Sequence, residues 1–439
     1  MNKVRIVGAG LAGSEAALQF AEAGWKVDLF EMRPKVKTPA HQSGDFAELV
    51  CSNSLKSNLV TTASGLLKAE MKLLGCKLLP IAETCSVPSG NALAINREIF
   101  SKKVTKHILN HPNINFINEE FIDFDDELTI LATGPLTSDN LIESLQDVVD
   151  NEHLYFFDAI APIVSADSLN YDVIYRKTRY DKGEADYLNC PFSKEEYLRF
   201  AEALKNAEKP KPKEFENRFF KEIKFTYYEN CTPIEELAQR GIETLRYGVM
   251  RPVGLENPND SDRRPYAVIQ LRAENLERTS YNLVGCQTMM KYGEQKEILR
   301  MIPGLGKADF LRYGSIHRNS YLNAPELLNA DFSLKQKKNI YVAGQFSGVE
   351  GYVESIFSGL LVANLILGKI TDLPEKTISK QLWKYLQINR KNFQPMNANF
   401  GLLPALSEKI KDKKLKKKKL AEISLEQLRM TKVKIKDSK

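Results

Sequence analysis

Two of the six cysteines stand where a thiol could do chemistry. Cys51 ends the apolar stretch "FAELV" and is followed at once by the polar stretch "SNSLKSN", so its sulfur is expected at the edge of a core. Cys231 follows "FTYYEN" and precedes Thr232-Pro233, where a proline and two glutamates predict the start of a helix. A thiol just before a helix N-terminus is favoured as the nucleophilic thiolate. From the residues alone, inert packing is still the stronger interpretation for both. The other cysteines are interpreted as small core residues: Cys76, Cys85, Cys190 and Cys286.

The elements that would position such thiols begin at the N-terminus. "VRIV" predicts a buried strand, "LAGSEAALQFAEAG" a helix that stops at Gly24, and "WKVDLFE" a second strand ending in Glu31. Between the first strand and the helix lies a G-x-G-x-x-G turn, in the context that a dinucleotide-binding βαβ unit requires. The turn predicts close approach of a pyrophosphate to a helix N-terminus, and Glu31 could accept hydrogen bonds from a ribose. We therefore expect cofactor binding by the following residues: Gly8, Ala9, Gly10, Leu11, Ala12, Gly13 and Glu31.

Two later stretches resemble further strands of the same sheet. "ELTILATGPLTSD" is an apolar run that ends in Thr133-Gly134, and "KNIYVAGQFSGVEGYVESIFSGLLVANLIL" predicts a strand, a glycine-rich turn and a helix of small residues. Both patterns recur in FAD-binding flavoproteins of the two-dinucleotide-fold type. Glycines allow the backbone to approach a flavin closely. Further FAD contacts are therefore expected at Gly134, Gly344, Gln345 and Gly351.

These assignments predict an α/β fold with a discontinuous domain. A Rossmann-like FAD-binding domain would use residues 1–160 and 325–400, and an inserted α+β domain would occupy 161–324. The insert contains a charged helical stretch ("SKEEYLRFAEALKNAEK"), a Pro/Lys linker ("PKPKEF") and the strand-like stretches "PYAVIQLRA" and "SYNLVGCQ". We expect it to contribute to the active site, and the family resemblance described below implies a contribution to RNA binding as well.

Composition indicates a globular cytoplasmic protein. Of 439 residues, 43% are hydrophobic and 27% charged, which is near the globular average. No apolar run has the length of a membrane span, and the chain starts directly with the first strand. No cysteines form a CxxC pair, so neither a zinc site nor any other metal site is expected, and free thiols suit a cytoplasmic chain.

The net charge of +6 is concentrated in the last segment. From Ser407 to Lys439 there are 13 Lys/Arg and 5 Asp/Glu, whereas the preceding residues carry 49 basic and 51 acidic groups. We treat residues 401–439 as a basic C-terminal tail. Such a run can attract a phosphate polyanion, and it can equally be a solvated segment that aids solubility.

Long stretches of the chain resemble the FAD- and folate-dependent tRNA (uracil-5-)-methyltransferases, which are related to a larger flavoprotein that modifies the wobble uridine of tRNA. The matching stretches run from residue 8 to residue 404: "GAGLAGSEAA", "FAELVCSNSLKS", "SVPSGNALAINRE", "ILATGPLTSD", "FDAIAPIV", "ENCTPIEELAQRGIETLRYGVMRPVGL", "HRNSYLNAP", "VAGQFSGVEGYVES" and "MNANFGLLP". The basic tail lies outside the resemblance.

The resemblance implies methylation of uracil C5 in the T-loop of tRNA. The carbon would come from 5,10-methylenetetrahydrofolate, the reductant would be reduced FAD, and NADH or NADPH would reduce the flavin. A thiolate adding at C6 makes C5 nucleophilic. The resemblance assigns that role to Cys231, and it places Cys51 nearer the flavin as an assistant, for example as the base at C5. It also offers Arg97, His317 and Arg318 as contacts to folate or phosphate, and the "MNANF" stretch as a neighbour of the site.

Three alternatives stay open at this point. The same chemistry could act on a uracil of ribosomal RNA, since nothing in the catalytic motifs separates the two polymers. An NAD(P)H-dependent flavin oxidoreductase acting on a small molecule would share the dinucleotide fold, but it has no need of Cys231. A non-catalytic flavoprotein that binds RNA would need neither cysteine. No membrane and no obligate protein partner is indicated.

Overall fold

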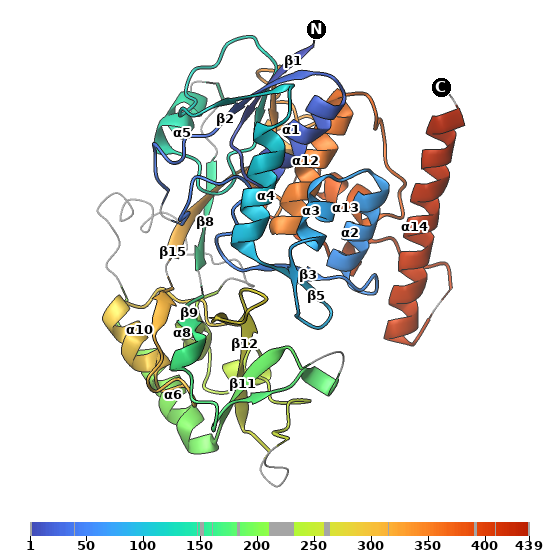
Figure 1. Ribbon diagram of the computed structural model, residues 1–439. Helices are drawn as coiled ribbons and strands as arrows, with labels where there is room; N and C mark the ends of the chain where they lie inside the picture. The colour runs from blue at the N-terminus through green and yellow to red at the C-terminus, as the bar shows by residue number, and fades with distance from the viewer. Residues whose placement is uncertain are drawn as a thin grey trace.

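A computed structural model (Figure 1) describes residues 2–38, 40–146, 148–149, 153–159, 161–181, 185–209, 232–258, 264–314, 316–389, 393–408 and 410–437, with the backbone alone at 153–159, 316–319 and 432–437. The fold is mixed α/β and contains two apolar cores. One core is built from residues between Val4 and Val149 and between Tyr321 and Leu428. The other is built from residues between Val164 and Ala308.

A five-stranded parallel sheet forms the centre of the first core, in the order β16-β7-β1-β2-β6. Its central strands are short and apolar, as expected for strands buried on both faces. Ile6 of β1 lies opposite Leu29 of β2 and Ile130 of β7. The strands span β1 Lys3–Val7, β2 Lys26–Phe30, β6 Ile114–Ile117, β7 Thr129–Leu131 and β16 Ile340–Val342. The sheet thus combines β1, near the N-terminus, with β16, which lies more than 300 residues further along the chain.

Two helices cross closely over this sheet. Helix α1 (Leu11–Glu22) follows β1, and α12 (Tyr352–Ile366) follows β16 and a 3-10 turn at Gly344–Ser347. An added Cβ at Gly359 would lie 2.2 Å from the Ala12 carbonyl oxygen, so this glycine permits the close crossing. Besides the C-terminal helix described below, further helices of this half are α2 Ala63–Leu73, α3 Leu78–Glu83, α4 Arg97–Leu109, α5 Asp139–Gln146, α11 Ala324–Leu327 and α13 Ile378–Tyr385.

Two smaller sheets join the halves of the molecule. One has the order β3-β5-β4, with β3 at Ser54–Ser57, β4 at Ser86–Val87 and β5 at Ala92–Ile95. The other is the antiparallel pair of β8 (His153–Ala159) and β15 (Ile316–Leu322), which runs between the upper and lower halves in Figure 1.

The second core lies against a six-stranded sheet in the order β10-β11-β12-β13-β9-β14. Helix α6 begins with a reciprocal capping box between Ser193 and Glu196. The strands span β9 Ile163–Ser165, β10 Tyr175–Arg176, β11 Tyr187–Phe192, β12 Ala267–Ala273, β13 Ser280–Leu283 and β14 Phe310–Arg312. The helices span α6 Lys194–Asn206, α8 Ile234–Gln239, α9 Thr244–Tyr247 and α10 Tyr292–Leu299.

Polar contacts tie the two halves together. The Asn53 side chain donates to the Ala273 carbonyl at 2.9 Å and accepts from Arg272 Nε at 2.7 Å. On the neighbouring loop, the Gly90 amide donates to the carboxylate of the buried Asp186 at 2.6 Å.

The segment that we took for a basic tail contains an ordered helix. Helix α14 (Lys413–Asp437) stands at the right of Figure 1 beside α2. Its side chains Leu420, Ala421 and Leu428 belong to the first core, because they repeat at helical spacing on one face. Among the described residues, no helix has both the length and the apolar character needed to cross a membrane.

Candidate active site

The three glycines of the G-x-G-x-x-G turn have different structural roles. A Cβ on Gly8 (φ +97°) would lie 2.7 Å from the Ala132 carbonyl oxygen, and one on Gly13 would lie 1.8 Å from the Gly8 carbonyl oxygen. These two glycines allow β1, β7 and α1 to pack closely. At Gly10, by contrast, nothing lies within 4 Å of an added Cβ. Gly10 is the N-cap of α1 and makes no side-chain cap bond. Of the three, Gly10 is therefore the one that presents open space before a helix N-terminus.

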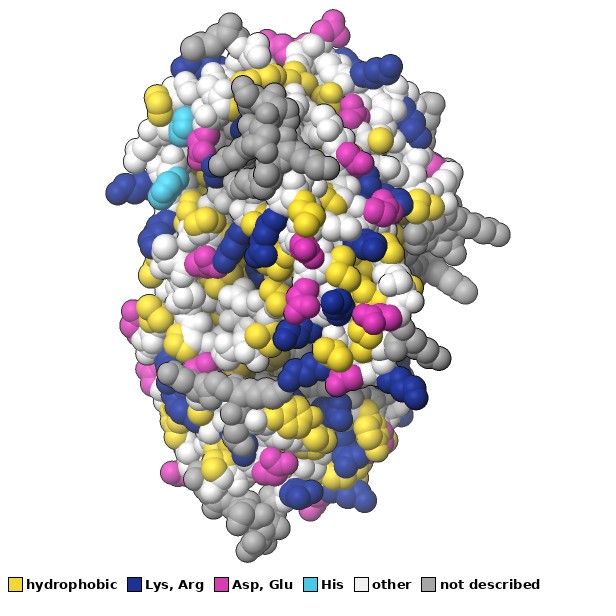
Figure 2. Space-filling view, turned by 90° about the vertical axis from the view of Figure 1, so that its right-hand side faces the viewer, with side chains coloured by type: hydrophobic (Ala, Val, Ile, Leu, Met, Phe, Trp, Pro, Cys, Tyr) yellow, Lys and Arg dark blue, Asp and Glu magenta, His cyan; other side chains and the backbone are white. Residues whose placement is uncertain are grey.

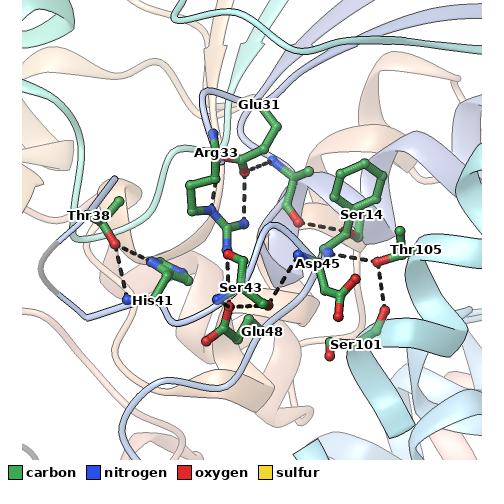
Figure 3. Close-up of polar contacts among 12 residues, drawn as sticks. Ser14, Glu31, Arg33, Thr38, His41, Ser43, Asp45, Glu48, Ser101 and Thr105 are labelled. Atoms are coloured by element: carbon green, nitrogen blue, oxygen red, sulfur yellow. Dashed lines mark hydrogen bonds and ion pairs between the residues drawn. The ribbon is translucent and has the colours of Figure 1, made fainter. Parts of the chain in front are cut away.

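Glu31 holds this turn through its carboxylate. Its Oε2 accepts from the Ala9 amide at 3.0 Å and from Arg33 Nη2 at 3.0 Å, and its Oε1 accepts from the amide and Nε of Arg33 (Figure 3). Four protein donors fill the acceptor positions of a carboxylate. We expected Glu31 to be open to a ribose, but the contacts show it ordering the glycine turn. A ribose contact by Glu31 stays a prediction.

Arg33, which we did not single out in the sequence, extends this network towards Cys51. Its Nη1 lies 3.4 Å from Glu48 Oε2, and the same carboxylate oxygen accepts from the Ser43 hydroxyl at 2.7 Å (Figure 3). The Ala47 amide then donates to the Ala9 carbonyl at 2.9 Å. The fingerprint turn and the segment that ends in Cys51 are thus fastened at several points.

Cys51 lies at the wall of a cavity and is half-buried. Its amide donates to the Tyr352 hydroxyl oxygen at 2.6 Å, and the Ser52 amide donates to the same oxygen at 3.2 Å. Burial, followed by the neighbouring Cys51, raises the pKa of the Tyr352 hydroxyl well above its usual range. Tyr352 therefore stays neutral and fixes the backbone at Cys51 from the first turn of α12.

Two arginines carry positive charge into the same region. Burial lowers the pKa of the Arg312 guanidinium and Arg97 lowers it further, whereas Tyr352 and Cys51 act in the opposite direction. Arg312 still carries its proton near neutral pH. Arg97 is ion-paired with Glu274 of the other half at 2.6 Å and donates to the Leu49 carbonyl at 3.1 Å. Its guanidinium thus already holds the two halves together.

The cavity has a volume of about 570 Å³ and collects residues from four separate parts of the chain: 10–64, 132–136, Gln287 and 344–398. That volume is typical of cofactor and ligand sites. It brings together eight of the residues predicted from the sequence: Gly10, Leu11, Ala12, Cys51, Gly134, Gly344, Gln345 and Gly351. Gly8 and Glu31 line a small adjoining recess that also reaches Gly10. Among the described residues, Ala9 and Gly13 line neither of these two spaces, and their contacts are within the turn and with Glu31.

The turn after β16 supplies the far wall. Gly344 (φ +74°) and Gly351 (φ +112°) adopt backbone conformations that favour glycine, and a Cβ on Gly344 would lie 2.8 Å from the Ala12 Cβ. Gln345 Nε2 donates to Glu350 at 2.7 Å. Gly351 is the N-cap of α12, so a second helix begins at this cavity.

A cluster of charges lies beneath the same wall. Lys56 adopts a left-handed backbone (φ +60°), lines the cavity and lies 3.2 Å from the fully buried Glu354 carboxylate. Glu354 also accepts from the Ala398 amide at 3.0 Å. Lys68 donates to the carbonyl oxygens of Leu55 and Lys56. Burial lowers the pKa of Lys68 to about 7.

Several sequence predictions fall elsewhere. Cys231, and the side chains of His317 and Arg318, lie outside the described residues. By contrast, Asn397 of the "MNANF" stretch does line the cavity, as the resemblance implied. Cys76, Cys85, Cys190 and Cys286 are buried, and burial raises the pKa of Cys286 to about 12. Among the described residues, no three His, Cys, Asp or Glu side chains are grouped so that they could hold a metal ion.

Comparison with known proteins agrees with this geometry. The family model described as glucose inhibited division protein A matches residues 3–374. A methylenetetrahydrofolate–tRNA-(uracil-5-)-methyltransferase TrmFO from Staphylococcus epidermidis is 49% identical over 433 residues, covering 97% of this chain and 98% of the relative. The chain therefore belongs to the family of methylenetetrahydrofolate–tRNA-(uracil-5-)-methyltransferases. The Bacillus subtilis TrmFO is likewise 49% identical over 431 residues, with 97% of both chains covered.

Solved structures support the fold. Aquifex aeolicus GidA superposes with a TM-score of 0.66 at 14% identity, covering 98% of this chain and 75% of that one. At this identity the likeness concerns the fold alone. It confirms the prediction of a Rossmann-like α/β flavoprotein fold.

Proposed function

We propose that this protein methylates C5 of a uracil in the T-loop of tRNA, with 5,10-methylenetetrahydrofolate as carbon donor and reduced FAD as reductant. The observation that carries the proposal is the single cavity in which the dinucleotide fingerprint, the turn after β16 and Cys51 meet. Relatives that share 49% of their residues over nearly the whole chain bear the corresponding name. The buried cysteines Cys76, Cys85, Cys190 and Cys286 are free thiols, which suits the cytoplasm, where tRNA and reduced folate are found.

The residues present fit FAD. Open space in front of Gly10 leaves room for a pyrophosphate against the start of α1. Gly344, Gln345 and Gly351 would hold the other end of the cofactor at the start of α12. When bound, FAD supplies the reducing equivalents for the methyl group, and NADH or NADPH restores them. The half-exposed Lys56, which lines the same cavity, adds a positive charge to its wall.

The protein's own contribution to the chemistry centres on its thiols. We propose that the Cys231 thiolate adds to C6 of the uracil, which makes C5 nucleophilic, and that it leaves again after the proton on C5 has been removed. Cys51, held at the cavity wall by the Tyr352 hydroxyl, would assist as the base at C5. This division of roles derives from the motifs around the two cysteines and from the position of Cys51.

The decisive experiment compares methylated uridines in tRNA and ribosomal RNA from cells with and without the gene, together with the absorbance of the purified protein. A yellow protein, and loss of 5-methyluridine from the tRNA T-loop, are expected. Loss of 5-methyluridine from ribosomal RNA instead would indicate that the substrate of the same reaction is a ribosomal RNA uracil. Oxidation of NAD(P)H without any change in RNA would favour a flavin oxidoreductase acting on a small molecule.

The thiol roles can be separated with RNA that carries 5-fluorouracil at the target. We expect Cys231→Ala to abolish both methylation and the denaturant-resistant protein–RNA band, because no adduct at C6 can form. Cys51→Ala should lower methylation by about 100-fold or more, the scale of a lost general base, and keep the band. Cys286→Ala, which removes a buried thiol, is the control. Loss of the band in Cys51→Ala alone would exchange the two roles.

A further inference from the structure

Helix α14 begins with six lysines in seven residues, and local contacts fix where it starts. Asp412 accepts from the amides of Lys414 at 2.7 Å and Leu415 at 3.1 Å, which caps the helix. These amides lower the pKa of the Asp412 carboxyl. We call Lys413 to Lys419 the lysine turns. Their lysine side chains are all exposed: Lys413, Lys414, Lys416, Lys417, Lys418 and Lys419.

The second half of α14 anchors the lysine turns to the body. Ala421, Ser424 and Leu428 are buried against the first core. The Ser424 hydroxyl donates to the buried carboxylate of Glu70 on α2, which also accepts from the amides of Ile378 and Ser379 at the start of α13. The direction in which the lysine turns project is therefore set by buried polar contacts and packing.

This charge arrangement opposes the helix that carries it. Positive side chains at a helix N-terminus are unfavourable with the helix dipole, and like charges three or four residues apart repel by a few tenths of a kcal/mol per pair. Lys418 lies 4.0 Å from Glu422, which offsets part of this cost. In Figure 2, Lys and Arg side chains (dark blue) are interspersed with Asp and Glu side chains (magenta) across the middle of the face shown. A polyanion bound to the lysine turns would reduce the repulsion among these lysines.

The lysine turns also lie near the segment that lines the cavity. Lys417 Nζ is 5.8 Å from the centre of the Phe400 ring. Phe400 is three residues beyond Asn397, which lines the cavity with Ala398, and three residues span at most about 11 Å. The positive charge is thus within reach of phosphates that flank a base entering the cavity.

We propose that the lysine turns bind the phosphate backbone of the RNA substrate beside the cavity, by charge and without reading sequence. The proposal rests on the proposed function insofar as the polyanion is taken to be the substrate RNA. Each phosphate that lysines neutralise releases counterions, so the logarithm of affinity should depend on the logarithm of salt concentration, with a slope that counts the contacts.

The test replaces Lys413, Lys414, Lys416 and Lys418 by Gln in the full-length holoenzyme. Gln is nearly as good a helix former as Lys, and circular dichroism checks that α14 persists. Binding of an unmodified tRNA transcript is measured between 50 and 200 mM salt. We expect the slope to fall by about 3, at roughly 0.7 to 0.9 per lost phosphate contact.

A matched control changes the net charge equally at other exposed lysines: Lys102, Lys106, Lys194 and Lys205. The control slope should change by less than about 1. An unchanged slope in the lysine-turn variant overturns the proposal, and so does an equal fall in both variants, since net charge alone would then explain it. A loss of binding to a polyglutamate peptide with an unchanged RNA slope would instead indicate a protein partner. Binding is measured without turnover, so a failure of the methylation assay and a failure of this test are distinguishable.

Discussion

Helices α1 and α14 both begin where we place a bound phosphate group, but they are built in opposite ways. Helix α1 has no charged residue in its first turn, and it is buried from Leu11 to Ala21 behind glycines. Helix α14 starts with exposed lysines and is anchored only further along. Backbone amides bind a ligand at a fixed geometry, and the site at the start of α1 therefore requires that no side chain block the approach. Lysines act over a distance, so that surface tolerates small changes. One methyl group added at Gly13 should therefore disrupt the first site, whereas the second should lose binding only when several of its charges are removed.

Gly13→Ala should have the largest effect. The new Cβ would lie 1.8 Å from the Gly8 carbonyl oxygen, which belongs to the backbone and cannot move without shifting β1. We expect a loss of at least about 3 kcal/mol of unfolding free energy, measured by denaturant titration. Gly10→Ala is the matched control, because its Cβ meets nothing within 4 Å and its φ of −70° suits any residue. Equal losses in both variants would contradict the distinction between packing and open glycines.

Gly10→Val separates ligand binding from folding. Since the space in front of Gly10 is open, the variant should fold with a loss of unfolding free energy below about 1 kcal/mol. The same side chain would occupy the approach of the pyrophosphate, so the purified protein should lack most of its flavin absorbance. Gly293→Val, in α10 and likewise with nothing within 4 Å of its added Cβ, is expected to keep the flavin. Full flavin content in Gly10→Val would place the cofactor elsewhere.

The contrast between the helices also explains what could be predicted from the sequence. The unit β1-α1-β2 is local, and its glycine spacing is typical of one geometry, so its elements and the position of Gly10 at the start of α1 were predictable. Cys51 was expected at an apolar-to-polar boundary and lies at the cavity wall. The link from Glu31 through Arg33 to Glu48 was missed, because ion-pair partners at such spacing leave no periodic signal.

Helix α14 was taken for a tail because its lysines dominate the composition. Leu420, Leu428 and, between them, Ser424 do repeat every four residues, which is helical spacing. The polar residue in the middle of this face hid the pattern. Its partner is Glu70, more than 300 residues away, and no local rule could have supplied it. The sequence thus predicted the elements around the glycine turn and the positive charge of the C-terminal segment, but not the helix or the tertiary contacts that hold that charge in place.

Ser424→Ala should have the smallest effect and sharpens the comparison at the anchor of α14. Burial raises the pKa of Glu70 above its usual value, and the Ser424 hydroxyl acts against that shift. A carboxyl whose folded pKa is raised binds more protons in the folded state, so its contribution to stability falls as pH rises from the unfolded value through the folded one. Removing the hydroxyl raises the folded pKa further, so the total fall becomes larger and extends to higher pH.

The loss in Ser424→Ala is therefore expected to depend on pH. It should be about 2 kcal/mol at the higher of two pH values, where Glu70 is ionised and an ionised acceptor loses a bond, and about 1 kcal/mol or less at the lower one, where Glu70 is protonated. Denaturant titrations at both pH values measure it, with Met430→Ala, on the exposed face of the same helix, as the control. A loss that does not change with pH would mean that Ser424 contributes by packing alone. The salt slope of RNA binding should stay near that of the unaltered protein, because the lysines that set it are intact and the remaining apolar contacts still hold the helix in place.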